Sequence, residues 1–225
     1  MAPGAPIAVP GAAGRPSYRL HYFALAGLGE PVRYLLHYGR IPFEDVRIDA
    51  KQWPEHKKKM PFGTMPVLEV DGVMYTQSRA ICRYLAGQVG LQGATPEECL
   101  HIDIVVETFN DLRAAVADWF YDANPETKAT KLRPLMEKTA PFYLSKFEAM
   151  AEANGGYLAN HKLTWADVYF CAPLTWFDAM LRQNVLEGYP ALQALRRRVD
   201  ALPGVADYVK SRHNAEKLCP RFIGP

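Results

Sequence analysis

The sequence predicts an α/β domain followed by an all-helical domain. Short runs with strand composition, separated by one helical pattern, occupy the N-terminal part, and long helical patterns replace them after the turn at 93–96. With 225 residues the chain is long enough for two small domains, and 49% apolar with 22% charged residues is typical of a globular protein. We place the domains at 17–92 and 97–214, between a flexible Pro/Ala/Gly-rich tail at 1–16 and an extension at 215–225.

The α/β domain begins with a strand and a helix. Residues 18–23 (YRLHYF) have strand composition, and the Gly-rich turn after them leads into a helix over 30–39, with Pro31 in its first turn. A second strand, 43–48 (FEDVRI), alternates along its length. The charged segment that follows contains Trp53 and is compatible with either a loop or a short helix.

A hairpin and a helix complete this domain. Two runs, 65–70 (MPVLEV) and 73–76 (VMYT), flank Asp71-Gly72, which favours a type I′ turn because both central residues of that turn have positive φ. After Ser78, apolar residues at helical spacing predict a helix over 79–90. The order βαβ followed by ββα is typical of a thioredoxin-like domain.

The second domain is predicted to be helical throughout. Turn residues separate helical patterns over about 97–122, 130–153, 164–183, 190–201 and 204–212. Thr164 and Asp167 have the spacing of a capping box, in which the hydroxyl accepts from the third helical N–H and the carboxylate accepts from the N–H of the capping residue. We assign this motif to folding, because it opens an otherwise apolar helix.

Composition excludes several classes of function. The 26 Lys and Arg against 24 Asp and Glu create no global field that would gather nucleic acid, and the basic runs at 56–59 and 196–198 are interpreted as solvated helix faces. The four cysteines are scattered without a C-x-x-C pair, which favours the cytoplasm over a secreted disulfide scaffold. The tail lacks the apolar region of a signal peptide and no stretch approaches a membrane span, so we expect no membrane partner.

One tyrosine stands where thioredoxin-like folds carry their chemistry, at the junction of the first strand and the first helix. Residues 23–31 contain no cysteine, which disfavours a thiol–disulfide oxidoreductase. Tyr22 brings a hydroxyl that can donate a hydrogen bond to an external thiolate and so favour its ionised form. A half-buried sheet tyrosine without chemistry is the alternative interpretation.

Three further features point to a ligand with a peptide backbone and a free carboxylate. A cis Met65-Pro66 bond would leave the Met65 backbone free to pair with an extended peptide, whereas a trans structural proline is the alternative. Gln77-Ser78 precedes a helix start whose N–H groups can bind an anion, although Ser78 also fits a simple N-cap. Trp53 and Lys57 place an indole donor and a cation four residues apart, and exposed surface residues would show the same spacing.

Together these segments resemble the cytosolic glutathione transferases, most closely the sigma class, which includes insect enzymes and haematopoietic prostaglandin D synthase. The resemblance covers about 17–214 and rests on YRLHYF, EPVRYL, FEDVRI, WPEHKKKMPFGTMPVLEVDG, QSRAICRYL, HIDIVVETFNDLR and LTWADVYF. It implies the glutathione transferase fold and a cytoplasmic homodimer. It also implies an enzyme of detoxification that conjugates glutathione, as co-substrate, to apolar electrophiles such as lipid peroxidation products, without a metal.

The resemblance also implies roles for individual residues. Tyr22 matches the catalytic tyrosine that stabilises the glutathione thiolate. The glutathione-binding positions match Tyr22, Trp53, Lys57, Gly63, Thr64, Met65, Pro66 (as the cis proline), Gln77, Ser78 and Asp111, the last reaching the glutathione of the partner subunit. The apolar pocket for the second substrate is assigned to Phe23, Leu28, Arg113 and Trp119, and Phe120 and Phe170 would add to it if they face the cleft.

Two departures from the vertebrate prostaglandin synthase set the alternatives. That enzyme has an arginine where this chain has Leu28, and an aspartate cluster that binds a divalent cation where this chain has Glu107, Asn110 and Asp111. We therefore expect no metal, and we keep a glutathione-dependent prostaglandin isomerase as the second hypothesis. The acidic spacing of Asp103, Glu107 and Asp111 also fits a plain solvated face. A crystallin-like, ligand-sequestering protein is the third hypothesis, and the retained site residues argue against it.

Overall fold

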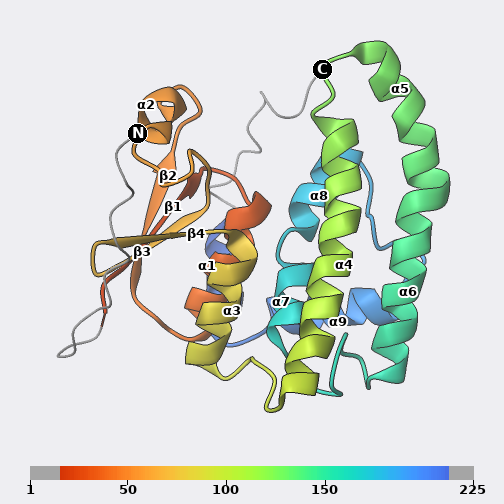
Figure 1. Ribbon diagram of the computed structural model, residues 1–225. Helices are drawn as coiled ribbons and strands as arrows, with labels where there is room; N and C mark the ends of the chain where they lie inside the picture. Colours follow the sequence, from red (N-terminus) through yellow and green to blue (C-terminus); the bar gives the residue numbers. More distant parts are fainter. Residues whose placement is uncertain (1–15, 213–225) are drawn as a thin grey trace.

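The computed structural model describes residues 16–212 and shows a small sheet domain beside a bundle of helices (Figure 1). The sheet has four strands in the order β2-β1-β3-β4. These are β1 (Tyr18–Phe23), β2 (Phe43–Ile48), β3 (Val67–Val70) and β4 (Val73–Thr76). The first two strands agree with the prediction at both ends, and the hairpin strand predicted from residue 65 begins at Val67.

Strand pairing follows from the connections. β1 and β2 run parallel because helix α1 (Glu30–Tyr38) lies between them in the chain, whereas β3 pairs antiparallel with both β1 and β4. The turn between β3 and β4 has φ of 49° at Asp71 and 82° at Gly72, which confirms the predicted positive φ at both central residues.

Helices cover one face of the sheet, and a small apolar cluster lies on the other. On one face, α1 and α3 (Ser78–Val89) pack against each other and against α7 of the helical bundle, as Figure 1 shows. On the other face, the short α2 (Trp53–Lys57) lies near an apolar cluster of Ile48, Met60 and Val67. The segment that the sequence left between loop and helix is therefore helical.

The second part of the described chain is helical. Its elements are α4 (Pro96–Phe120), α5 (Pro125–Pro134), a π-helical turn η2 (Leu135–Thr139), α6 (Ala140–Ala153), α7 (Trp165–Cys171), α8 (Leu174–Leu181), α9 (Pro190–Asp200) and α10 (Val205–Arg212). A short 3-10 turn, η1 (Gly27–Gly29), precedes α1. The continuous apolar core runs through this bundle and into the sheet domain. Within the described residues, no helix combines the length and apolar character needed to cross a bilayer.

Two of the predicted helices differ from the structure, one in its start and local geometry and the other in its continuity. The helix predicted over 130–153 begins earlier, at Pro125, and changes to π-helical geometry directly after Pro134. The helix predicted over 164–183 is broken between α7 and α8, where Pro173 has no N–H to continue the ladder. Proline chemistry accounts for both differences.

The predicted capping box at the start of α7 is confirmed. Thr164 donates from both its backbone N and its Oγ1 to Asp167 Oδ2, at 2.8 and 3.1 Å, and the Leu158 N–H donates to Asp167 Oδ1 at 2.8 Å. Burial raises the pKa of the Asp167 carboxyl to about 6 against the lowering effect of these donors. The motif anchors the loop before α7 in the core, as its assignment to folding predicts.

Candidate functional site

Tyr22 lies at the end of β1, beyond the last residue that pairs with β3. Its side chain is 7% exposed, and its hydroxyl accepts a hydrogen bond of 2.9 Å from the Leu28 N–H in the turn before α1. The glycines of this turn let it fold closely over the ring: a Cβ at Gly27 would come within 2.5 Å of Tyr22 Oη. The hydroxyl is thus held at the strand-to-helix turn, where the sequence placed it.

The Tyr22 phenol keeps its proton at neutral pH. Burial raises the pKa of Tyr22 to about 12, against the lowering effects of the Leu28 N–H and the charges of Arg33 and Arg113. A phenol with this pKa acts as a hydrogen-bond donor. Because it stays protonated, it cannot act as a base at neutral pH. Its oxygen already accepts from Leu28, so the hydroxyl proton is the group left to offer a thiolate.

The segment before β3 presents backbone groups outside the sheet. The Met65-Pro66 peptide bond is cis, as the resemblance predicts. Val67 is the first residue of β3 that pairs with β1 and with β4. The N–H and C=O of Met65 therefore take no part in the ladder. Gly63 has φ of 60°, and a Cβ there would lie 3.3 Å from Lys57 Cε, which shows that the lysine stem crosses this glycine.

The start of α3 differs in detail from the prediction. Ser78 was expected as a possible N-cap, but Gln77 is the capping residue, with φ of 73° and no side-chain cap hydrogen bond, and Ser78 is the first helical residue. A non-glycine residue in this conformation is uncommon, so the local sequence did not predict it. Gln77 is exposed whereas Ser78 is buried, with its Oγ 3.5 Å from the Tyr169 hydroxyl.

Trp53 and Lys57 both lie on α2, which follows β2 in the chain. The Trp53 indole packs edge to face against Phe23, with ring centroids 5.4 Å apart, and Phe23 in turn contacts the Tyr22 ring at 5.8 Å. Lys57 is exposed at the other end of the helix. The aromatic contacts therefore connect α2 with the tyrosine at the end of β1.

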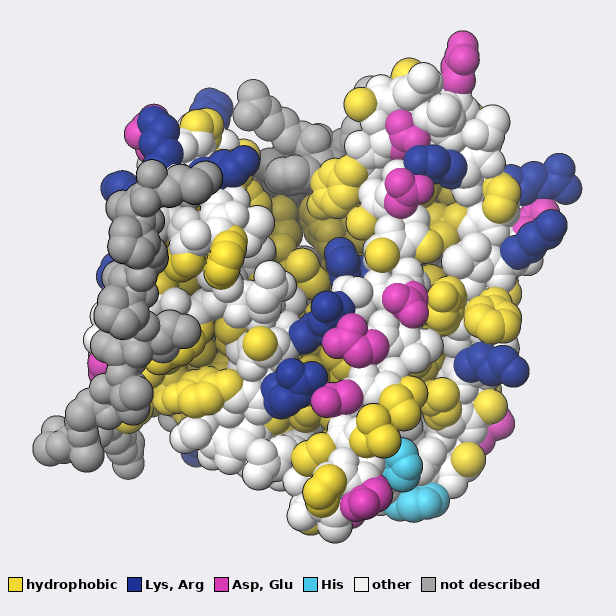
Figure 2. Space-filling model, viewed as in Figure 1, with side chains coloured by type: hydrophobic (Ala, Val, Ile, Leu, Met, Phe, Trp, Pro, Cys, Tyr) yellow, Lys and Arg dark blue, Asp and Glu magenta, His cyan; other side chains and the backbone are white. Residues whose placement is uncertain are grey.

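The acidic residues of α4 form two ion pairs with α3. Arg79 meets Glu107 at 3.1 Å and Arg83 meets Asp103 at 3.0 Å, and Figure 2 shows basic side chains next to acidic ones on this face. Asp111, one turn further, is exposed. No group of three metal-ligating side chains occurs in the part of the chain that the structure describes.

The residues predicted for the second pocket come together in part. Leu28 and Phe23 flank Tyr22, and the charge of Arg113, on α4, acts on the hydroxyls of both Tyr22 and Tyr121. Trp119 instead lines a cavity of about 270 Å³ between α4 and α5. Phe170 is fully buried against other core aromatics, so it does not face a cleft.

Sequence reasoning missed two residues near Tyr22. Tyr121, directly after α4, is 57% exposed, and its hydroxyl contributes to raising the pKa of Tyr22. Its position two helical turns beyond Arg113 could have indicated that it lies on the same side of α4. Arg33, on α1, is fully buried with its guanidinium carbon 5.7 Å from the centroid of the Tyr22 ring. No local pattern distinguishes this arginine from a surface residue of the same helix.

Comparisons with known proteins agree along both parts of the chain. Family models for the glutathione S-transferase N-terminal and C-terminal domains match residues 18–87 and 110–212. A glutathione S-transferase of Anopheles gambiae is 45% identical over 88% of this chain and 97% of its own length, and glutathione S-transferase S1 of Drosophila melanogaster is 46% identical over 87% and 79%. The solved structure of prostaglandin synthase D of Nilaparvata lugens matches with a TM-score of 0.85 at 43% identity, covering 88% of this chain and 98% of that chain.

Proposed function

This chain belongs to the glutathione S-transferase family, and from that membership we propose that it ionises the thiol of glutathione at Tyr22 and transfers it to electrophilic small molecules. The observation that carries this proposal is the Tyr22 hydroxyl: it is buried, protonated, and fixed at the strand-to-helix turn by the Leu28 N–H. A cysteine is absent from this turn, so the reacting sulfur has to come from the substrate.

Glutathione would lie along the edge formed by the segment before β3 and the start of α3. The Met65 N–H and C=O would pair with its peptide backbone, as an added strand pairs with a sheet edge. The N-terminal N–H groups of α3, with Gln77 and Ser78, would bind the carboxylate of the γ-glutamyl end. Trp53, Lys57, Gly63 and Thr64 would hold the other end.

The reaction needs one proton transfer and one new bond. Glutathione loses its thiol proton to solvent, and the Tyr22 O–H donates to the resulting thiolate, which lowers the thiol pKa. The sulfur lone pair then attacks an electrophilic carbon. In a substitution, the leaving group departs with its bonding electrons; in an addition to an unsaturated aldehyde, the neighbouring carbon takes up a proton. Docking both substrates side by side removes much of the entropic barrier.

We also propose that the enzyme is a cytoplasmic homodimer in which Asp111 serves the partner's glutathione site. Asp111 is exposed on the same face of α4 as its ion-paired neighbours, and exposed apolar side chains of α3 and α4 accompany it: Tyr84, Leu100 and Ile104. The three cysteines in the described residues are free thiols, which fits a reducing compartment.

A second function is favoured by the name of a structural relative. The structural relative from Nilaparvata lugens is named a prostaglandin synthase D, so isomerisation of a prostaglandin endoperoxide by the same thiolate is the alternative activity. That reaction would return glutathione unchanged, whereas conjugation consumes it.

The two activities are separated by following glutathione and product together. Purified protein is offered a chloronitrobenzene, unsaturated aldehydes, organic peroxides and the endoperoxide, and thiol consumption is measured beside product formation. We expect conjugates with stoichiometric loss of glutathione. Failure to bind immobilised glutathione and to ionise it, measured by thiolate absorbance, would exclude both activities and leave a ligand-binding protein.

A further inference from the structure

The buried guanidinium of Arg33 holds the backbone of the segment that follows Tyr22. Its Nη1 donates to the Leu25 carbonyl at 2.8 Å and its Nη2 to the Phe23 carbonyl at 3.3 Å. These two carbonyls belong to the turn that carries the chain from the end of β1 to Leu28, whose N–H reaches the Tyr22 hydroxyl. The Arg33 side chain thus holds two carbonyls of the segment that joins β1 to Leu28.

Two carboxylates orient this guanidinium. Glu30 accepts from Nη1 at 3.1 Å, and Asp45 of β2 accepts from Nε at 3.1 Å. Arg33 and Glu30 are both 0% exposed, and replacing water around such groups is costly, so a pair of this kind is weak evidence for stability. Its effect lies in geometry: all three guanidinium nitrogens have hydrogen-bond partners, which fixes the orientation of the planar group.

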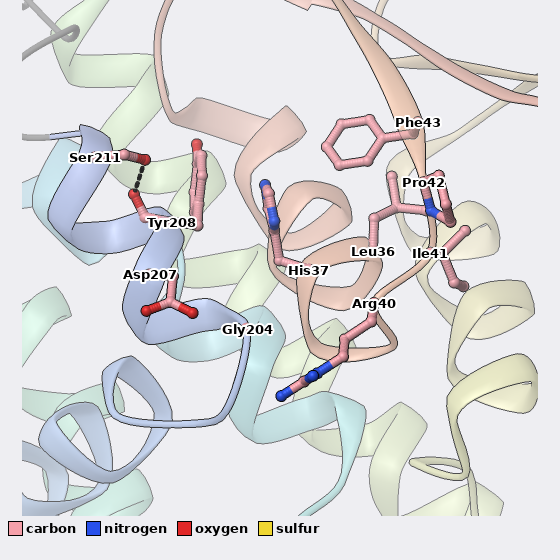
Figure 3. Close-up of a pocket in the computed structure, with 10 residues that line it drawn as sticks. All are labelled: Leu36, His37, Arg40, Ile41, Pro42, Phe43, Gly204, Asp207, Tyr208 and Ser211. Atoms are coloured by element: carbon pink, nitrogen blue, oxygen red, sulfur yellow. Dashed lines mark hydrogen bonds between the residues drawn. The ribbon is translucent and has the colours of Figure 1, made fainter.

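The last described helix completes the network. The Tyr208 hydroxyl of α10 donates to Glu30 Oε2 at 3.1 Å. Its ring stacks on His37 of α1, with centroids 4.4 Å apart and planes at 17°, and Figure 3 shows the two rings side by side at the wall of a cavity of about 580 Å³. None of the residues predicted for the glutathione site lines this cavity. Tyr208 is therefore linked, through Glu30 and Arg33, to the turn between β1 and α1.

We propose that Arg33 is a positioning residue for the thiolate-stabilising hydroxyl of Tyr22, and that Tyr208 of α10 belongs to the same hydrogen-bond network. This inference rests on the proposed function, because it concerns the hydroxyl that ionises glutathione. Arg33 touches the turn and the face of the Tyr22 ring, and its side chain is fully buried, so any effect on a bound thiol passes through Tyr22 and the turn. The other charged and titratable groups that act on Tyr22 come from α4 and the residue after it, Arg113 and Tyr121.

The test compares three purified variants, Arg33→Lys, Tyr208→Phe and Tyr34→Phe. Lysine keeps the charge but loses the planar fork, so it cannot hold both carbonyls and both carboxylates. We expect Arg33→Lys to lower kcat/KM by about tenfold and to raise the pKa of bound glutathione by about one unit, the equivalent in free energy. The glutathione KM should change far less, since the binding edge is untouched.

Tyr208→Phe should shift the bound-thiol pKa in the same direction by a smaller amount, because it removes one hydroxyl from Glu30. Tyr34→Phe is the matched control: its hydroxyl also connects α1 to the helical domain, by donating to Asp200 at 2.9 Å, but it does not reach Arg33. We expect the control to leave the bound-thiol pKa unchanged. Melting temperature and circular dichroism are recorded for all three.

The outcomes separate this inference from the proposed function. A wild-type protein that does not ionise glutathione would overturn both. A wild type that does so, with a folded Arg33→Lys variant whose bound-thiol pKa is unchanged, would overturn the inference alone. If Arg33→Lys does not fold, Tyr208→Phe decides: a bound-thiol pKa equal to that of Tyr34→Phe overturns the inference, and a raised one supports it.

Discussion

The two ends of the proposed glutathione site are built in opposite ways. At the thiol end, Tyr22 is buried and its hydroxyl is engaged by the Leu28 N–H. At the γ-glutamyl end, Gln77 and Asp111 are exposed, and the acidic neighbours of Asp111 are already paired with arginines of α3. A buried polar group must find its partners within the chain, so its geometry is set before substrate arrives, whereas an exposed group keeps its water until a ligand or a second subunit replaces it. We therefore expect the thiol end to control turnover and the other end to control affinity.

Removing the Tyr22 hydroxyl should have the largest effect. Tyr22→Phe deletes one charge-assisted hydrogen bond to the thiolate, worth roughly 1.5–3 kcal/mol, so kcat/KM should fall about ten- to a hundredfold with little change in glutathione affinity. Tyr18→Phe is the matched control, since Tyr18 lies on the same strand and its hydroxyl meets Tyr84 at 3.4 Å instead of the turn. Equal activity in the two variants would remove Tyr22 from its proposed role.

The pH dependence should report the thiol alone. Because burial raises the pKa of Tyr22 from its ordinary 10.0 to about 12, the phenol stays protonated wherever the enzyme works. Any stability that its raised pKa contributes is complete below pH 10 and is lost only as the pH rises towards 12. The kcat/KM profile should rise through the bound-thiol pKa and then level off. Tyr22→Phe should move that rise to higher pH by about one to two units, because the ionised thiol loses its donor. A second titration of the wild type between neutral pH and 9 would contradict this assignment.

At the exposed end the expected effect is smaller and appears in affinity. Asp111→Ala should raise the glutathione KM about three- to tenfold and leave kcat nearly constant, because a hydrogen bond made by an exposed side chain contributes only about 0.5–1.5 kcal/mol. Asp103→Ala, on the same helix, removes a surface ion pair with Arg83 and should change neither constant. Analytical ultracentrifugation should show a dimer. A monomer with an unchanged KM would show that Asp111 serves no partner site.

The sequence predicted best what depends on neighbouring residues. The ends of β1 and β2, the Asp71-Gly72 turn and the capping box at Thr164 all follow from local composition and turn chemistry, and the structure agrees with each. The position of Tyr22 follows in turn from the strand and the glycine-rich segment after it. Local chemistry also pointed to Met65, Gln77, Ser78, Trp53 and Lys57, whereas the family resemblance added Gly63, Thr64 and Asp111 and decided for the cis bond before Pro66.

What escaped prediction depends on distant contacts. Gln77 has a positive φ at the junction between the hairpin and α3, a conformation for which glutamine has no intrinsic preference. The break between α7 and α8 and the π-helical turn follow prolines whose effect in a helix depends on how the surroundings compensate. Arg33 is identified only once β2 and α10 have brought Asp45 and Tyr208 beside α1.

The last and smallest effect concerns which electrophile the thiol end accepts. Leu28 is half-buried and its backbone N–H meets the Tyr22 hydroxyl, so its side chain offers apolar surface beside the thiol end, and an apolar ligand gains roughly 25 cal/mol for each Å² it buries there. We expect the wild type to conjugate lipid-derived unsaturated aldehydes faster than it isomerises the prostaglandin endoperoxide. Leu28→Arg should move the ratio of the two rates a few-fold towards the endoperoxide, because it supplies a cation for a polar head group. Leu28→Gln, polar but uncharged, should move it less. A wild type that already favours the endoperoxide would refute the preference whatever either variant does.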